Sequence, residues 1–309
     1  MTASLREALD DYLTMRRALG YRLDRPEKLL NQFLDHLGDV DAEGVTVEAS
    51  LAWACLPAEG DGYWWAYRLS VVRGFATYLH TLDPTVEVPA TDLLPWQVRR
   101  ACPYLYSESD VAALIAAASS LSSPLRRVTF ATLIGLLAVS GMRVGEAIAL
   151  DRDDLDTSEG LLVVRHGKFD KSRELVLHPS TTDALRGYLR RRDQLHPSPH
   201  SPSLFISTAG TRLIYCNVHW TFHRLVQRAG LTPRSATCRP RIHDLRHSFA
   251  VASMLDAYAA GDDGRARLTL ISTYLGHVDP GGTYWYLSAA PELLGLAAQR
   301  LEQHSAGPS

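Results

Sequence analysis

A proline-rich stretch about a third of the way along the chain most constrains how its 309 residues can fold. Residues 83–103 contain four prolines and show little hydrophobic periodicity. Because proline fixes φ and removes a backbone donor, such a stretch interrupts both helices and sheets. We therefore predict two domains, over residues 1–82 and 104–309, joined by an extended linker over residues 83–103.

The first domain is predicted to consist of four helices. Apolar residues recur at helical spacing over residues 5–19, 24–37, 45–56 and 61–80. Asp24 is predicted as an N-cap, because a proline follows it within the first turn. The tryptophans of this domain are interpreted as core residues rather than as a platform for a ligand.

The second domain is predicted to be α+β. Short β-type runs at residues 161–165 and 174–178 flank the polar residues 166–173, a pattern typical of a hairpin with a cationic tip. Residues 151–159 are predicted to be an acidic turn. Helices are predicted over residues 108–118, 124–139, 180–195, 216–229, 268–275 and 291–303, with two more ending near residues 150 and 259. The fold class is thus mainly α with a small antiparallel β-sheet.

Charge is unevenly distributed, although the formal net charge is only −2. Residues 1–95 carry 8 basic and 15 acidic side chains, whereas residues 165–246 carry 15 basic and 5 acidic ones. Such a distribution suits a protein that presents a cationic face to a polyanion, and it also fits a solvated arginine-rich surface. The sequence alone leaves these two interpretations open.

The cysteines and the apolar runs exclude several classes of protein. The four cysteines, Cys55, Cys102, Cys216 and Cys238, are far apart in the sequence and include no CxxC pair, which argues against a zinc site or a disulfide framework. No apolar run approaches the roughly 20 residues that span a bilayer, and the N-terminus lacks a signal-peptide core. We expect a cytoplasmic protein with no membrane partner.

Three cationic motifs lie in the second domain. Arg143, in the segment Ser-Gly-Met-Arg-Val-Gly-Glu, opens a helix, where a planar guanidinium is costly to bury unless it meets an anion. Lys168, one of only three lysines, lies at the hairpin tip. His243 and Arg246 are three residues apart, which places both side chains on one helix face.

The fourth motif is His277 followed nine residues later by Tyr286. A phenol with an unperturbed pKa of about 10 is a poor nucleophile at neutral pH, so a reactive tyrosine needs nearby cations. Tyr284 is the alternative nucleophile. The two tyrosines would face nearly opposite ways on a helix, so only one of them can reach a given phosphate.

In this order the six residues resemble the active site of the tyrosine recombinase (phage integrase) family, which reads Arg, Lys, His-x-x-Arg, His or Trp, then Tyr. The resemblance covers roughly residues 104–298. It implies a site-specific DNA recombinase that cuts and rejoins double-stranded DNA through a 3′-phosphotyrosyl intermediate. It also makes the first domain the family's helical DNA-gripping (SAM-like) domain and the second its catalytic domain.

The resemblance implies a role for each residue of the set. Tyr286 would attack the phosphate, which Arg143, Arg246 and His277 would hold. Lys168 would protonate the leaving 5′-hydroxyl, and His243 would assist proton removal from the tyrosine. Among their neighbours, Glu146 would orient Arg143 or a histidine, Asp244, His247 and Ser248 would be structural hydrogen-bonders, and Lys171 and Arg173 are candidate phosphate contacts.

No cofactor or metal is implied, because the cations are side chains. His243 and His247 have the i, i+4 spacing of metal ligands, but no glutamate lies between them and no third ligand is evident. The expected partners are double-stranded DNA and further copies of the chain in a homotetramer, with residues 291–303 docking on a neighbour. An accessory recombinase or another protein encoded by the same element is a possible partner.

Two alternative functions stay open at the level of the sequence. A type IB topoisomerase shares the nucleophile chemistry but relaxes supercoils, and a DNA-binding regulator would carry a disabled site. The segment 283–293 is more similar to integrases of mobile elements, which act in DNA integration and transposition, than to chromosome-resolving Xer-type enzymes.

Overall fold

The computed structural model contains two compact units, residues 1–100 and 101–309. The residues that it describes are 2–42, 44–57, 62–95, 101–165 and 172–276. None of the described helices combines the length and the apolar character that crossing a bilayer would require.

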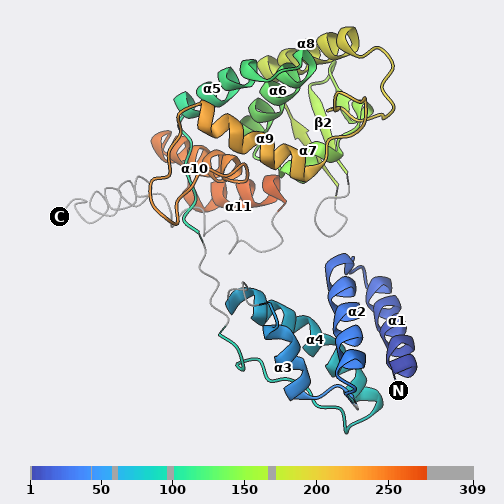
Figure 1. The fold of residues 1–309 in the computed structure, drawn as a ribbon. Coiled ribbons are helices and arrows are strands. Elements are labelled where there is room, and N and C mark those ends of the chain that lie inside the picture. The colour runs from blue at the N-terminus through green and yellow to red at the C-terminus, as the bar shows by residue number, and fades with distance from the viewer. Residues whose placement is uncertain (1, 43, 58–61, 96–100, 166–171, 277–309) are drawn as a thin grey trace, which may run out of the picture. The chain divides into compact units, whose positions relative to one another are not determined.

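The first unit is a bundle of four helices (Figure 1). They are α1 (Thr2–Ala18), α2 (Asp24–Asp39), α3 (Val47–Cys55) and α4 (Gly62–Leu82). Its core includes Phe33, Trp53 and Phe75, which are all at most 2% exposed, and the rings of Phe33 and Trp53 pack edge to face. The four predicted helices are therefore confirmed, and Trp53 is a core residue as predicted.

The predicted N-cap of α2 is wrong by one residue. The helix already includes Asp24, and its N-cap is Leu23, which has a left-handed φ of 52° and makes no side-chain cap. The proline that marked the helix start therefore lies at the third helical position. An aspartate before a proline favours a cap locally, but here the turn ahead of α2 shifts the boundary by one residue.

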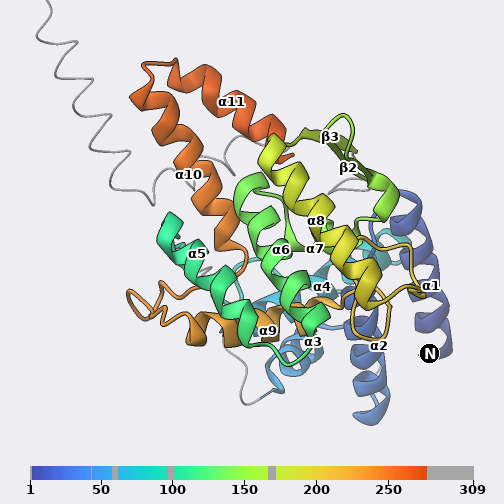
Figure 2. The ribbon, with the colours of Figure 1, turned by 90° about the horizontal axis from the view of Figure 1, so that it is seen from above.

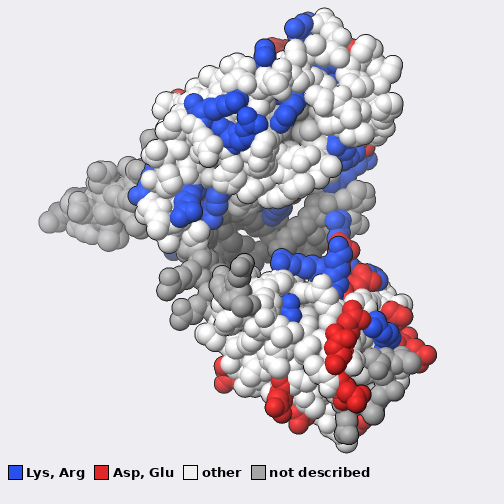
Figure 3. All heavy atoms as spheres, viewed as in Figure 1, with Lys and Arg blue, Asp and Glu red and all other residues white. Residues whose placement is uncertain are grey.

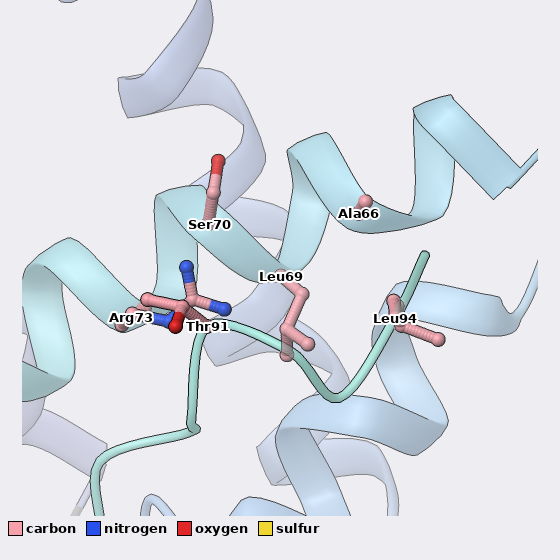
Figure 4. A pocket seen from close by; sticks show the side chains of 6 residues that line it. All are labelled: Ala66, Leu69, Ser70, Arg73, Thr91 and Leu94. Carbon is pink, nitrogen blue, oxygen red and sulfur yellow. The ribbon is translucent and has the colours of Figure 1, made fainter. Parts of the chain in front are cut away.

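The segment that follows α4 packs against the first unit. Val86, Val88 and Leu94 contact its core, and the Arg73 side chain donates hydrogen bonds to the carbonyls of Pro89 and Ala90, both at 2.7 Å. The same segment closes a shallow pocket on α4 (Figure 4), lined by Ala66, Leu69, Ser70, Arg73, Thr91 and Leu94. Residues 86–94 are thus part of the first unit rather than a free linker.

The second unit is built around α6 (Pro124–Ser140), against which α5 (Glu108–Ala117), α8 (Pro179–Leu195) and α10 (Asp244–Ala259) all pack (Figure 2). The other helices among its described residues are α7 (Val144–Ala149), α9 (Tyr215–Arg228), α11 (Gly264–Leu275) and the short 3-10 segments Ala118–Ser120 and Arg152–Asp154. Leu133, Leu137 and Phe222 lie in its main core, and α11 packs on α10 through a smaller cluster that includes Met254 and Leu275.

The described part of the second unit also contains a three-stranded antiparallel sheet. Its order is β1 (Leu155–Asp156), β2 (Leu161–Val164) and β3 (Arg173–Val176). Strands β2 and β3 pair antiparallel, as the predicted hairpin requires, with Leu162 opposite Leu175. Strand β1 falls where an acidic turn was predicted, because a two-residue strand is too short to leave a periodic pattern.

The predicted fold class, mainly α with a small antiparallel sheet, is confirmed. The assignment of residues 1–82 to DNA gripping and of residues 104–309 to catalysis stays a prediction.

Candidate active site

Arg143 lies at the start of α7, directly after the turn that ends α6. That turn needs Gly141, whose φ is 58°, and a Cβ there would collide with the Phe249 ring of α10. The backbone N–H of Arg143 donates to Glu146 Oε2 at 2.9 Å, and its Nη1 donates to Oε1 at 2.8 Å. Glu146 therefore orients Arg143, as the sequence predicted.

Glu146 also binds a second arginine. Arg173, the first residue of β3, donates from Nη2 and Nη1 to the two Glu146 oxygens at 2.8 and 3.2 Å. Burial of the carboxyl would raise its pKa, but the hydrogen bonds from Arg173 and Arg143 outweigh it and lower the pKa of Glu146 to about 2. The carboxylate therefore stays ionised between two guanidinium groups.

Arg246 is 1% exposed and joins two motifs that are far apart in the sequence. Its Nη1 donates to the carbonyl of Gly141 at 2.8 Å, and its Nη2 donates to the carbonyl of Leu275 at 2.6 Å. The turn before Arg143 and the end of α11 are thus held by one buried cation. A buried guanidinium needs such partners, because an uncompensated charge in the protein interior is costly.

His243 is the N-cap of α10 and lies near Arg143 and Arg246. The residue is exposed to solvent. The protein atoms packed around the ring disfavour its charged form, and the neighbouring His247, Arg246 and Arg143 add to this effect, so that the pKa of His243 is lowered to about 4. The imidazole is therefore neutral at pH 7, the form that can accept a proton.

Asp244 stabilises the start of α10. It is fully buried, and its carboxylate accepts hydrogen bonds from Arg241 Nε and Nη2 at 2.9 and 2.8 Å. His247 Nδ1 lies 3.3 Å from the same carboxylate. The Ser248 hydroxyl accepts a hydrogen bond from the Tyr106 N–H at 2.7 Å. These contacts agree with the structural roles expected for Asp244, His247 and Ser248.

The structure thus brings together Arg143, His243 and Arg246. The other three predicted site residues, Lys168, His277 and Tyr286, lie outside the described residues, as do Lys171 and the alternative nucleophile Tyr284. The described chain ends at Gly276, one residue before His277.

Arg173 is the residue that sequence reasoning assigned incompletely. The sequence predicted it as a candidate phosphate contact, whereas in the structure its guanidinium forms an ion pair with Glu146. These residues are 27 positions apart, and no local pattern relates them. Within the described part of the chain, no group of three or more His, Cys, Asp or Glu side chains could hold a metal ion.

Lys and Arg side chains form several patches on the face of the second unit that Figure 3 shows, and few acidic side chains are visible there. On the first unit, acidic side chains gather along one side. The picture agrees with the uneven charge along the sequence, and contact of the cationic patches with a polyanion stays a prediction.

Comparison with known proteins places the chain in a family. The model of the phage integrase family matches residues 105–292. The chain belongs to this family. This phage integrase family member is 41% identical over 307 residues to the putative integrase/recombinase y4rB of Sinorhizobium fredii, an alignment that covers 97% of this chain and 98% of the relative.

Two further comparisons cover most of this family member. It is 30% identical over 311 residues to the tyrosine recombinase XerD of Caulobacter vibrioides, covering 97% of this chain and 92% of the relative. Its fold is similar to that of the XerH site-specific recombinase in a post-cleavage complex with palindromic difH substrate, with a TM-score of 0.64 and 19% identity, covering 90% of this chain and 78% of that one.

The prediction of a tyrosine recombinase fold is therefore confirmed. The predicted activity is also confirmed at the level of the family, namely site-specific recombination by DNA cleavage and rejoining. The comparisons favour neither a topoisomerase nor a catalytically silent regulator.

Proposed function

We propose that this recombinase cuts double-stranded DNA by attack of the Tyr286 hydroxyl on a backbone phosphate. The attack forms a 3′-phosphotyrosyl bond and releases a 5′-hydroxyl. The 5′-hydroxyl released from the partner duplex then attacks this phosphorus, forms the recombinant phosphodiester and frees the tyrosine. The number of phosphoester bonds is conserved at each step, so rejoining needs no nucleotide cofactor. The main observation in support of the proposal is the buried guanidinium of Arg246. It binds both the turn before Arg143 and the end of α11.

In this proposal two arginines hold the phosphate. Arg143 is oriented by Glu146 and 26% exposed along its side chain, so part of it is open to a ligand. Arg246 lies close to Arg143, because it donates a hydrogen bond to the carbonyl of Gly141, two residues before Arg143. Negative charge grows on the equatorial oxygens as the tyrosine attacks, and prepositioned guanidinium groups stabilise that charge without reorganising. His277 would donate a hydrogen bond to the same oxygens.

Two further residues would move protons. His243 is proposed to take the phenolic proton, because its ring is neutral at pH 7 and lies near Arg246 and Arg143. Lys168 would protonate the leaving 5′-oxygen, the role that the resemblance gives to the hairpin lysine. It lies on the segment between β2 and β3, and β3 begins with Arg173 next to Glu146.

We propose that four copies of the chain act together. Exchange between two duplexes cuts four strands, and each tyrosine forms one covalent bond at a time. Residues 291–303 are proposed to dock on a neighbouring copy. Removal of the chain after Ala290 should then abolish tetramers on DNA. Persistence of tetramers after this truncation would show that the tail closes its own domain.

We infer that the enzyme serves a mobile element and acts in the cytoplasm, where it would meet bacterial DNA. The similarity to relatives named integrase/recombinase supports this, since the identity of 41% exceeds the 30% to XerD. Inverted repeats or transposition genes beside the coding sequence would support a mobile element. A site beside the replication terminus, with no such repeats, would instead support chromosome resolution.

The test begins with duplexes recovered from a random-sequence pool by binding to the full chain. The recovered site is rebuilt with a nick near the cleavage position, so that the short 5′-hydroxyl strand diffuses away and covalent protein–DNA accumulates. Wild type and Tyr284→Phe should form a complex that resists denaturant, and Tyr286→Phe should not. The assignment is wrong if Tyr286→Phe still forms it, or if Tyr284→Phe abolishes it while the protein remains folded.

A further inference from the structure

Arg173 connects three elements of the candidate site. It begins β3, its two Nη atoms grip both oxygens of Glu146 at the start of α7, and its side chain is only 16% exposed. The third element is the end of α11. A Cβ placed on Gly276 would lie 3.3 Å from Arg173 Nη1, so the guanidinium closely approaches this residue. Gly276 has a φ of 69°, a conformation that glycine adopts without strain.

Arg173 changes the net charge of the group that surrounds Arg143. Arg143 and Glu146 alone would form a neutral pair, and the field that Arg143 presents to a phosphate would be weakened. Arg173 adds a second positive charge to the same carboxylate, so the group of three carries one net positive charge. Because Glu146 is 8% exposed along its side chain, water screens these charges only partly.

We propose that Arg173 is a positioning residue for strand cleavage: it neutralises Glu146 so that Arg143 keeps its positive charge for the phosphate. Arg173 takes no chemical step itself. The inference rests on the proposed function of Arg143 as a phosphate-holding group. It differs from the earlier expectation that Arg173 contacts phosphate directly, because here the charge of Arg173 acts on Glu146.

The test is a double-mutant cycle on the nicked duplex rebuilt from the selected site. Arg173→Gln should slow covalent-complex formation at saturating DNA by about 100-fold, with little change in DNA affinity. Adding Glu146→Gln to that variant should restore about tenfold of the rate, because the uncompensated carboxylate is gone. A merely structural role predicts the opposite, since the second change removes further hydrogen bonds.

Two variants control for folding. Arg186→Gln removes an exposed arginine of α8 that pairs with Asp183, and it should leave the cleavage rate unchanged. Arg173→Lys keeps the positive charge but loses the bidentate hydrogen bonds to Glu146. It should therefore cleave at least tenfold faster than Arg173→Gln. Where Arg173→Gln does not melt cooperatively, the comparison is made between Arg173→Lys and wild type, with a loss of about tenfold expected.

The outcomes separate this inference from the proposed function. If wild type forms no covalent complex, the proposed function fails. If wild type cleaves and a folded Arg173→Gln cleaves within twofold of it, only the role of Arg173 fails. The role also fails if the double variant is no faster than Arg173→Gln.

A second inference concerns two cysteines that are far apart in the sequence. Cys102 and Cys238 both point at the carbonyl oxygen of Pro103, with sulfur–oxygen distances of 3.8 and 3.5 Å. Cys102 is exposed and Cys238 is buried. Both sulfurs thus lie beside one oxygen atom, and burial, followed by the neighbouring Cys102 thiol, raises the pKa of Cys238.

We infer that Cys102 and Cys238 form a disulfide when the protein meets a peroxide. The exposed Cys102 thiolate would attack hydrogen peroxide to give a sulfenic acid and hydroxide. The Cys238 sulfur would then displace water from that sulfenic acid. Two thiols lose two electrons and two protons in total, and one peroxide becomes two waters. The bond would tie the residues that enter the second unit to the loop ahead of His243.

Peroxide treatment of the full folded chain, followed by alkylation in denaturant and peptide mapping of each cysteine, tests this inference. Cys102 and Cys238 should become resistant to alkylation together and recover with dithiothreitol, while Cys55 and Cys216 stay reactive. In Cys102→Ser, Cys238 should remain alkylatable. The inference is wrong if Cys102 is oxidised to a sulfinic acid while Cys238 stays free, or if either cysteine pairs elsewhere.

Discussion

Arg246 donates a hydrogen bond to the carbonyl of Leu275 at 2.6 Å, although the two residues are 29 positions apart and lie on different helices. A second hydrogen bond from the same guanidinium reaches Gly141 at 2.8 Å. The segment that leads to His277 is therefore held beside the turn that leads to Arg143. This contact connects the stability of the second unit to the arrangement of its candidate site.

Replacing Arg246 with lysine should therefore lower the free energy of unfolding. An ammonium group cannot span both carbonyls as the planar guanidinium does, so at least one charge-assisted hydrogen bond is lost, at about 2–3 kcal/mol. Urea unfolding of the second unit measures the change. Arg191→Lys, at an exposed position of α8, should alter it by less than about 0.5 kcal/mol. Equal stability of Arg246→Lys and wild type would contradict the bridging role.

Alanine at Gly141 should also destabilise the protein. The residue has a φ of 58°, and a Cβ there would lie 2.9 Å from Phe249 Cγ and 3.0 Å from Leu275 Cδ2. We expect a loss of about 2–3 kcal/mol, from backbone strain and overpacking together. Thermal melting provides the measurement. Gly145→Ala is the matched control, because no neighbouring heavy atom lies within 4 Å of that Cβ and alanine favours the helix. The explanation fails if both variants melt like wild type.

The Glu146 carboxylate should make stability depend on acidic pH. Its pKa of about 2 in the folded protein lies below the ordinary value of 4.5, so the folded state favours the ionised form. This contribution is fully present above about pH 4.5 and is lost as the pH falls toward 2, by about 3 kcal/mol in total.

Comparison with Glu146→Gln isolates this contribution, because the other carboxyls titrate in both proteins. The stability advantage of wild type over the variant should shrink between pH 5 and pH 2, as followed by urea unfolding at each pH. A constant difference across this range would show that Glu146 has an ordinary pKa.

His243 should remain a proton acceptor in mildly acidic solution. Its pKa of about 4 is below the ordinary 6.5, so nearly all of it is neutral at pH 5.5, whereas an unshifted histidine would be about nine-tenths protonated there. Single-turnover cleavage of the nicked duplex should therefore change less than twofold between pH 7.5 and 5.5 because of this residue. A roughly tenfold fall with a midpoint near pH 6.5, absent from His243→Gln, would contradict the shifted pKa.

The same shift has a consequence for stability. A histidine whose pKa is lowered on folding favours the folded state above its unfolded pKa of about 6.5. That contribution is lost as the pH falls from 6.5 toward 4. This pH range begins above the range in which the contribution of Glu146 is lost. Wild type should therefore lose stability relative to His243→Gln between pH 6.5 and 4.5, measured by urea unfolding.

Much of the fold followed from local patterns in the sequence. The helical spacing of apolar residues predicted each helix of the first unit, and two short β-type runs around a polar segment predicted the pairing of β2 with β3. The helix predicted over residues 108–118 corresponds to α5, whose start has reciprocal capping bonds between Ser107 and Asp110. These signals are readable because the residues involved interact within about four positions of one another or repeat with the period of their element. The order of the four motifs, from Arg143 to Tyr286, likewise indicated the family.

The tertiary structure alone decided which side chains meet. It placed Arg173 on Glu146 across 27 positions, Arg246 on Gly141 across 105, and the thiols of Cys102 and Cys238 on one carbonyl. It also packed residues 86–94 against α4, where the prolines had indicated only a linker. A single sequence carries no periodic trace of such contacts, because they depend on how α6, α7, α10 and α11 pack rather than on chain spacing. Local chemistry thus determined the elements and the motif order, and packing determined the charges and partners of the residues within the site.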